Sequence, residues 1–291
     1  TYEELLDLVD AVAIATPLRT HFALAKQALE AGKHVVIEKP MAASTQEALE
    51  LTKLAERSNL TLAVDHTFLF TGAVMKVEEV VNKGDIGNLW YYDSQRVNLG
   101  LFQHDTNVIW DLAPHDLSIM MEIVKEAPCR VHAHGAIHTD VGHCDMAWLH
   151  FLFPSGLVAN CHVSWLSPVK VRRIVIAGSA KMVVYDEMDV VEKVRIFDKG
   201  IDQYYEPDNV GKAKIQYRIG DVYAPHIDNT EALQLLVDNF LKAIEEDQKV
   251  AVDGYEGARV IRVLEACDES LAKGGAPVDI EWPEELKGTQ K

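Results

Sequence analysis

Short apolar runs alternate with helix-period segments over residues 10–70. The runs DAVAIA and HVVIE, at residues 10–15 and 34–38, are each followed by a longer segment in which apolar residues recur every three to four positions. Short, continuous apolar runs are typical of strands buried in a parallel sheet, and the longer period is typical of helices. We therefore predict βαβ units, with strands at residues 10–15, 34–38 and 60–65 and helices at residues 20–31 and 44–57.

Two local signals support the helix boundaries. Gly32 follows the first predicted helix, and glycine is the preferred residue just beyond a helix C-terminus. Ser44 precedes the second helix and Glu47 lies three residues later, a spacing that predicts a capping box.

The pattern changes beyond about residue 85 to closely spaced strand-like runs. Turn signals such as Pro154-Ser155-Gly156 separate runs only a few residues apart, which indicates antiparallel hairpins in a large sheet. We predict an α/β fold with a division into residues 1–70, which hold the parallel units, and an α+β domain at residues 71–291. The predicted strands lie at residues 89–97, 130–138, 146–153, 157–165, 171–177, 181–186 and 192–197, and two helices follow at residues 230–246 and 254–273.

Composition and charge narrow the classes of partner. The formal net charge is −17, so most of the surface would repel a phosphate backbone, and we expect no nucleic acid partner. Lys170, Arg172 and Arg173 form the one visible basic cluster. The four cysteines are irregularly spaced, and no apolar run approaches the ~20 residues that span a bilayer. We therefore expect reduced thiols, no membrane partner and a cytoplasmic protein.

Polar residues follow the first two predicted strands. Thr16, Pro17 and His21 come after the first strand, and Glu38-Lys39-Pro40 ends the second. The carboxyl ends of parallel strands are where open α/β sheets bind ligands. Each motif also has a structural interpretation, because a proline often begins a helix and a lysine is usually a solvated surface charge.

A third cluster, WDLAPHD, covers residues 110–116. Pro114 suits the first turn of a helix, so we expect His115 and Asp116 at a helix N-terminus with Asp111 just ahead of it. In one interpretation both aspartates only favour the helix dipole. In the other, Asp111 orients His115, an acid/base that titrates near neutral pH.

Taken together, these motifs resemble the glucose–fructose oxidoreductase, inositol dehydrogenase and MocA family of oxidoreductases. The matching features are ATPxxxH at residues 15–21, EKP at residues 38–40 and DxxxH at residues 111–115, in the order found in the family. The resemblance implies a Rossmann domain for NAD or NADP, followed by an open-faced sheet domain that carries the substrate and often mediates homo-oligomer formation, as a dimer or tetramer.

The resemblance also implies residue roles. Lys39 would contact both the nicotinamide ribose and the reacting hydroxyl, His115 would exchange the proton of that hydroxyl, and Asp111 would be the partner of His115. The Lys39-Pro40 bond is often cis in relatives. The residues implied to line or approach the dinucleotide are Thr16, Pro17, His21, Glu38, Lys39, Pro40 and His66.

The sequence departs from the family in one respect. The family opens with a strand and a glycine-rich GxGxxG turn that binds pyrophosphate, and this sequence contains no such motif. We therefore expect the printed sequence to begin within a Rossmann domain and to be a partial one that lacks the first strands. The expected consequences are weak NAD(H) binding and an exposed strand edge beside residues 10–15.

The segments RVNLG and SWLSPVKVRR look most like relatives that oxidise C3 of UDP-N-acetylhexosamines or their uronates. Ordinary solvated cations on a sheet face are the alternative. A dinucleotide-dependent sensor is a second possible function, although it would not need Lys39, Asp111 and His115. A glycosidase that uses transient oxidation is the third. The substrate candidates are Arg96, Asn98, Trp165, Lys170 and Arg172, no residue is predicted to bind a metal, and the expected ligand is a sugar or nucleotide sugar.

Overall fold

A small parallel sheet forms the N-terminal part of the protein. The computed structural model describes residues 1–140, 142–205 and 213–287. Strands β1 (Ala11–Ile14), β2 (His34–Glu38) and β3 (Leu62–Asp65) pair in parallel in that order. Helices α2 (Leu18–Glu30) and α3 (Thr45–Arg57) cover one face, against which Val35 and Ile37 are fully buried. The predicted alternation of strands and helices is confirmed.

The predicted helix ends are largely confirmed. Gly32, just beyond α2, has a φ of 74°, which a glycine adopts without steric cost. The Ser44 side chain accepts from the Glu47 N–H at the start of α3, as a cap should. The Glu47 carboxylate accepts from the Ala43 N–H at 3.0 Å rather than from Ser44, so only half of the predicted capping box forms.

The second sheet has nine strands in the order β11-β10-β9-β8-β4-β7-β6-β5-β12. The pair β4–β7 is parallel and the other pairs are antiparallel, which confirms a large, mostly antiparallel sheet. The strands are β4 (Leu89–Leu99), β5 (Arg130–Ala136), β6 (Met146–Leu152), β7 (Val158–Ser164), β8 (Leu166–Gly178), β9 (Met182–Asp186), β10 (Val194–Tyr205), β11 (Ala213–Tyr223) and β12 (Val278–Asp279).

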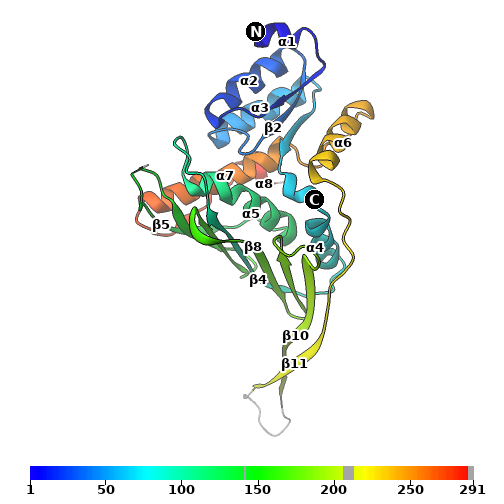
Figure 1. Ribbon diagram of the computed structural model, residues 1–291, viewed down its shortest axis with the longest axis vertical. Helices are drawn as coiled ribbons and strands as arrows, with labels where there is room; N and C mark the ends of the chain where they lie inside the picture. The colour runs from blue at the N-terminus through cyan, green and yellow to red at the C-terminus, as the bar shows by residue number, and fades with distance from the viewer. Residues whose placement is uncertain (141, 206–212, 288–291) are drawn as a thin grey trace.

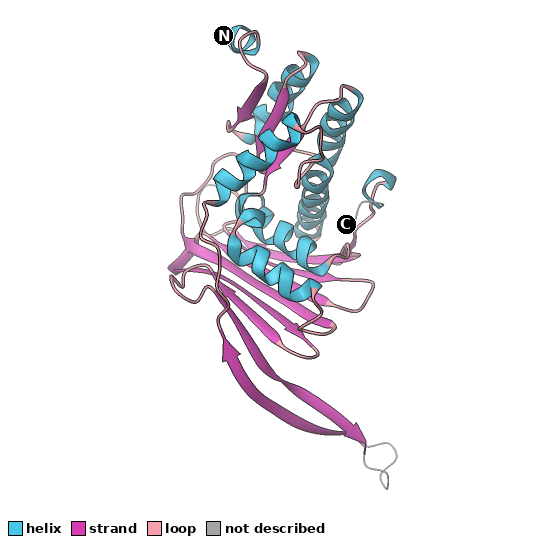
Figure 2. Ribbon diagram, turned by 90° about the vertical axis from the view of Figure 1, so that its right-hand side faces the viewer, coloured by secondary structure: helices cyan, strands magenta, loops and turns pink. Residues whose placement is uncertain are grey.

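Helices cover only one face of this sheet. In Figure 2 they all lie on the side of the small sheet, and the opposite face is open. Strand residues follow this asymmetry: Val131 and Ala133 of β5 are fully buried, whereas His132 and His134 between and beyond them face outward. The covering helices are α4 (Gly72–Asn82), α5 (Val108–Val124) and α7 (Gly254–Ala272).

The C-terminal part of the chain returns to the small sheet. Helix α6 (Ala232–Glu245) packs Phe240 and Ala243 against Ala63 and Val36, on the face opposite α2 and α3 (Figure 1). By packing, α6 therefore belongs with the parallel strands. The division at residue 70 follows the sequence but not this arrangement. The remaining elements are α1 (Tyr2–Leu6), the 3-10 helix η1 (Thr67–Phe70) and α8 (Glu284–Lys287).

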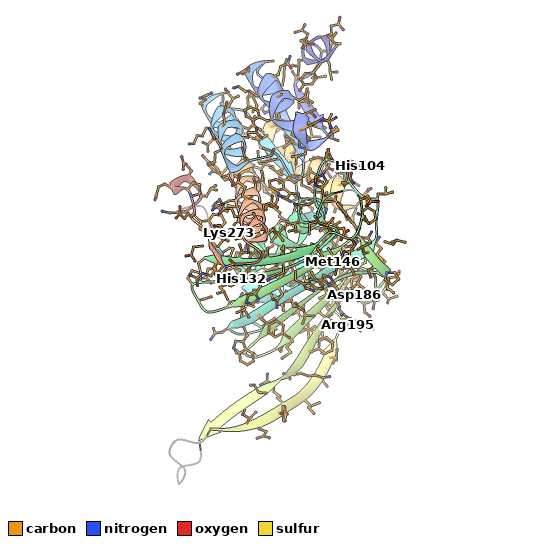
Figure 3. The ribbon with its side chains drawn as sticks, turned by 90° about the vertical axis from the view of Figure 1, so that its left-hand side faces the viewer. His104, His132, Met146, Asp186, Arg195 and Lys273 are labelled. Carbon is orange, nitrogen blue, oxygen red and sulfur yellow. The ribbon has the colours of Figure 1, made fainter. Side chains whose placement is uncertain are left out.

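Strands β10 and β11 continue beyond the sheet as a long hairpin, at the bottom of Figure 1. Figure 3 shows side chains projecting from both sides of this arm, below the labelled Asp186 and Arg195. Tyr217 and Ile219 are 77% and 83% exposed there. No helix of the described residues is long and apolar enough to cross a membrane.

Candidate active site

The ends of the three parallel strands bring the first group of predicted residues together. Thr16 and Pro17 follow β1, Lys39 follows β2, and His66 follows β3, so all lie at the carboxyl edge of the sheet. Thr16 and Pro17 are exposed. The Lys39-Pro40 bond is cis, as the family resemblance implied.

His21 links two of these strand ends from inside the protein. It is 2% exposed, and its ring nitrogens lie 2.7 Å from the Thr16 carbonyl oxygen and 2.9 Å from the Pro40 carbonyl oxygen. With both nitrogens occupied by backbone, His21 shapes the loops around the site rather than offering a free nitrogen to a ligand.

Helix α5 carries Asp111 and His115, and its start differs from the prediction. The helix begins at Val108, six residues before Pro114, because the Asn107 side chain accepts from the N–H groups of Ile109 and Trp110. The prediction that Pro114 opens the helix is therefore wrong. His115 lies within the helix rather than at its N-terminus, one turn after Asp111.

A proline inside a helix disturbs the preceding turn, and Lys39 uses one of the carbonyls there. Pro114 has no N–H to donate to the Trp110 carbonyl, and its ring crowds that turn. The Lys39 ammonium donates to the neighbouring carbonyl oxygen of Asp111 at 2.7 Å. Lys39 is thereby fixed against α5, with 16% of its side chain exposed.

The Asp111 carboxylate faces Lys39 and Trp165. Its Oδ1 lies 4.0 Å from the Lys39 Nζ, and its Oδ2 accepts from the Trp165 Nε1 at 2.9 Å. No hydrogen bond joins Asp111 to His115 among the residues that the structure describes. The predicted role of Asp111 as the orienting partner of His115 is not what this arrangement shows.

His115 is held by an aromatic contact instead. The Phe68 ring meets it edge-on, with the ring centroids 4.7 Å apart, and the His115 Nδ1 is buried without a partner. Burial lowers the pKa of His115 well below its ordinary value, and the positive charges of Lys39 and Arg96 lower it further. The interpretation in which His115 titrates near neutral pH is therefore not supported, because the ring is buried and Asp111 is turned toward Lys39 and Trp165.

Burial also shifts the pKa values of Lys39 and Glu38. Burial lowers the pKa of the Lys39 ammonium, and the negative charges of Asp111 and Glu38 oppose part of that shift. The pKa of the Glu38 carboxyl is raised by burial and by the adjacent Asp65, with which Glu38 pairs across β2 and β3. Perturbed titratable groups of this kind gather at functional sites.

His66 is buried with both of its ring nitrogens unpaired in the part of the chain that the structure describes. It is 1% exposed, and neither of its ring nitrogens has a hydrogen-bond partner in the described structure. Burial, assisted by the charge of Lys39, lowers its pKa to about 3. Buried polar atoms are rarely left unpaired, so the unsatisfied imidazole beside Lys39 marks this strand end as a candidate functional position.

Two predicted substrate residues lie behind the site rather than at its surface. Arg96 is 2% exposed and its Nε donates to the buried Asp116 at 2.6 Å, while its guanidinium lies over the Phe68 ring. Trp165 is 1% exposed, and its ring N–H is taken by Asp111. Direct substrate contact by either side chain is therefore not supported.

The other predicted substrate residues remain accessible. Asn98 and Arg172 are partly exposed and Lys170 is exposed. Arg172 lies opposite Arg96 across β4 and β8, and it donates to Glu187 at 2.8 Å.

Two residues of this cluster, Phe68 and Glu187, were not predicted from the sequence. Phe68 follows the buried His66 by two positions, which is a weak signal. Glu187 lies in a turn after β9, and only the pairing of distant strands brings it to Arg172.

The strand-end residues fit a dinucleotide. Exposed Thr16 and Pro17, the Lys39 ammonium and the unsatisfied His66 line one edge of a parallel sheet, where such cofactors bind. Within the described residues, no cluster of three or more potential ligands for a metal ion is found.

Family comparisons agree with this arrangement. Residues 1–66 match the family model described as an oxidoreductase family with an NAD-binding Rossmann fold, and residues 74–184 match the GFO/IDH/MocA C-terminal domain. The chain belongs to the GFO/IDH/MocA oxidoreductase family. It is accordingly an oxidoreductase with an NAD-binding Rossmann domain, as the sequence motifs implied.

Individual similar proteins are also oxidoreductases. A UDP-N-acetylglucosamine 3-dehydrogenase from Acidithiobacillus ferrooxidans is 30% identical over 273 residues, covering 89% of this chain and 78% of the relative. A structure of that enzyme has a TM-score of 0.75 at 27% identity and covers 95% of this chain and 83% of that chain. An inositol dehydrogenase homologue from Azotobacter vinelandii, complexed with NADH and myo-inositol, has a TM-score of 0.78 at 19% identity, covering 96% and 82%. At 19% identity, the likeness to the inositol dehydrogenase homologue shows the fold alone.

Proposed function

We propose that this oxidoreductase transfers hydride between a nicotinamide and a ring carbon of a nucleotide sugar, at C3 of a UDP-N-acetylhexosamine. The observation that carries the chemistry is the placement of Lys39 and His115 around one point at the sheet edge, beside the unsatisfied His66. The sugar assignment is supported by the 30% identical UDP-N-acetylglucosamine 3-dehydrogenase.

The residues divide the reaction between them. When bound, the nicotinamide supplies the acceptor for the hydride that leaves the carbinol carbon. The Lys39 ammonium donates a hydrogen bond to the substrate hydroxyl oxygen and stabilises the negative charge that develops there. His115, kept neutral by burial, accepts the hydroxyl proton. In the opposite direction the protonated His115 returns that proton to the carbonyl oxygen.

Two cations lie near the end of β4 that carries the partly exposed Asn98. Arg172 lies opposite Arg96 across β4 and β8, and the exposed Lys170 directly precedes Val171, the partner of Val97, where the register between the two strands is irregular. On a chain with a net charge of −17, such a local positive cluster is what a diphosphate would need. We place the nucleotide part of the substrate against Asn98, Lys170 and Arg172.

A nucleotide sugar should therefore be oxidised with a much higher kcat/KM than free hexoses or inositols. The Lys170→Glu variant should raise KM for the nucleotide sugar with little change in kcat, because it removes binding away from the reacting carbon. Arg173→Glu is the matched control, since Arg173 lies on the same strand but faces the open side of the sheet. Nicotinamide absorbance with a panel of UDP-sugars and free sugars provides the measurement. Equal efficiency with free sugars would contradict the proposed substrate.

We also propose that the enzyme self-associates, as a dimer or tetramer, through the open face of the nine-stranded sheet. This face carries mostly neutral side chains around Trp148, which is 51% exposed and stacks on His162 with ring centroids 4.7 Å apart. It also contains a depression of about 360 Å³ that His132 and His134 help to line (Figure 3 labels His132). An exposed patch of this kind is typical of an interaction surface.

The assembly proposal predicts a change of mass in solution. Trp148→Glu should convert the oligomer to a monomer in size-exclusion chromatography with light scattering, because it buries a charge at the proposed contact. Met188→Glu, in the turn after β9, introduces the same charge at an exposed apolar residue elsewhere. A wild-type protein that is monomeric at micromolar concentration, or a Trp148→Glu variant that keeps its mass, would refute this interface.

A further inference from the structure

The indole of Trp165 occupies a fixed position behind the reacting groups. Trp165 lies at the corner between β7 and β8, where its backbone N–H donates to the Asp145 carbonyl at 3.0 Å and its carbonyl accepts from the Gly100 N–H at 3.1 Å. Phe102 meets the indole edge-on with ring centroids 5.4 Å apart. Backbone bonds and an aromatic contact thus hold one side chain that is 1% exposed.

Gly100 shows how closely this side chain is enclosed. A methyl group added at Gly100 would lie 3.1 Å from the Trp165 Cδ1 and 2.8 Å from the Asn98 Nδ2. The strand end that carries Asn98 therefore packs against the indole with no spare room. Trp165 has one polar atom, its ring N–H, and that atom points at the Asp111 carboxylate.

This contact sets the distance between two charges. With Oδ2 bonded to the Trp165 N–H, the Asp111 carboxylate stands 4.0 Å from the Lys39 Nζ, beyond hydrogen-bond distance. The ammonium donates to the Asp111 backbone carbonyl instead. A carboxylate released from the indole could rotate toward Lys39 and form a direct ion pair.

We propose that Trp165 is a positioning residue that holds the Asp111 carboxylate away from Lys39, so that the ammonium stays available to the substrate hydroxyl. Nothing in the family match assigns this role. The proposal rests on the proposed part of Lys39 in the reaction. This role explains why the buried indole donates its one hydrogen bond to a carboxylate at the site.

Trp165→Phe keeps an aromatic ring and removes the N–H. We expect kcat to fall roughly 10- to 100-fold with little change in KM, because the misplaced ammonium matters most in the transition state. The alkaline limb of the pH–rate profile that reflects Lys39 should move to higher pH, since a closer carboxylate favours the charged form. Asp111→Asn, which removes the charge, should move the same limb to lower pH.

A double-mutant cycle separates this role from a general loss of packing. If Trp165 acts through the Asp111 charge, the Trp165→Phe/Asp111→Asn enzyme should stay within about twofold of Asp111→Asn alone. The matched control is Trp282→Phe, a partly buried indole before α8 whose ring N–H donates to the Pro128 carbonyl at 2.9 Å; its effect should multiply with that of Asp111→Asn. Multiplicative effects for Trp165, or an unmoved pH limb, would overturn the proposal.

Two further measurements keep the test decisive. If Trp165→Phe does not fold, Gly100→Ala should shift the indole and move the pH limb in the same direction, and an unmoved limb would overturn the proposal. The Trp165 indole N–H resonance should shift on Asp111→Asn, whatever the activity, and an unchanged resonance would also overturn it. A wild-type protein that oxidises no sugar contradicts the proposed function, whereas an active wild type without coupling contradicts only the role of Trp165.

Discussion

Replacing His115 or Lys39 with alanine should each lower kcat by at least ~10²-fold, the low end for a positioned acid or base. Hydride cannot leave the carbinol carbon productively unless the hydroxyl proton also leaves. His115 can accept it across the neutral range, because burial keeps the imidazole uncharged there. Lys39 stabilises the oxygen that loses the proton, so its removal should lower kcat and kcat/KM together.

The measurement is steady-state kinetics from pH 6 to 9 on the protein with NAD and the best UDP-sugar. His104→Ala, an exposed histidine in the loop before α5, controls for the loss of a histidine as such (Figure 3). Asp111→Asn should do less damage than either alanine variant and should alter the pH–rate profile. Near-normal turnover of His115→Ala over this range would remove His115 from the mechanism.

Local patterns predicted the parallel part of the fold well. The short apolar runs became β1 and β2, in which Val12 and Ile14 and then Val35 and Ile37 are buried, while the residues between them are less deeply buried and Ala13 is exposed. Ser44 and Gly32 mark helix ends through local interactions and backbone conformation, and such features can be recognised from a few neighbouring residues. The grouping of Thr16, Lys39 and His66 then follows from parallel topology alone.

The start of α5 was predicted wrongly because two local signals compete. Pro114 suits a first turn, but Asn107 caps the helix earlier through the N–H groups of Ile109 and Trp110, and a distant residue holds the Asn107 side chain in place. Asp268 of α7 accepts from the Asn107 side chain at 3.0 Å and from the Trp110 ring N–H at 2.6 Å. Since this carboxylate lies 161 residues from Asn107, no local pattern reveals it.

The burial of individual side chains was the second property that the sequence did not predict. Arg96 and Trp165 are chemically suited to a nucleotide sugar, and their segments prompted that prediction. Their burial depends on which face of β4 is covered by α5 and on the corner between β7 and β8. Asp116 then neutralises Arg96 inside the protein, where an unpaired charge would be too costly.

Acid should destabilise this protein more steeply than its carboxylates alone would, and His66 should be a main cause. Its pKa is about 3 in the folded protein and ~6.5 in an unfolded chain. Below pH 6.5 the unfolded chain therefore binds a proton that the folded protein does not, and the free energy of unfolding decreases as the pH falls. Between pH 6.5 and 4 this difference amounts to about 3 kcal/mol for one such histidine.

His66→Leu removes the titrating group at similar size, so its free energy of unfolding should fall less steeply between pH 6.5 and 4 than that of the wild type. His115 has a lowered pKa of the same origin and will keep part of the slope in both proteins. Urea unfolding followed by tryptophan fluorescence, at several pH values without dinucleotide, measures the difference. His104→Leu is the control for losing a histidine. If wild type and His66→Leu show parallel curves down to pH 4, the folded protein already accommodates a charged His66, and the unsatisfied imidazole beside Lys39 is not excluded from water as its burial indicates.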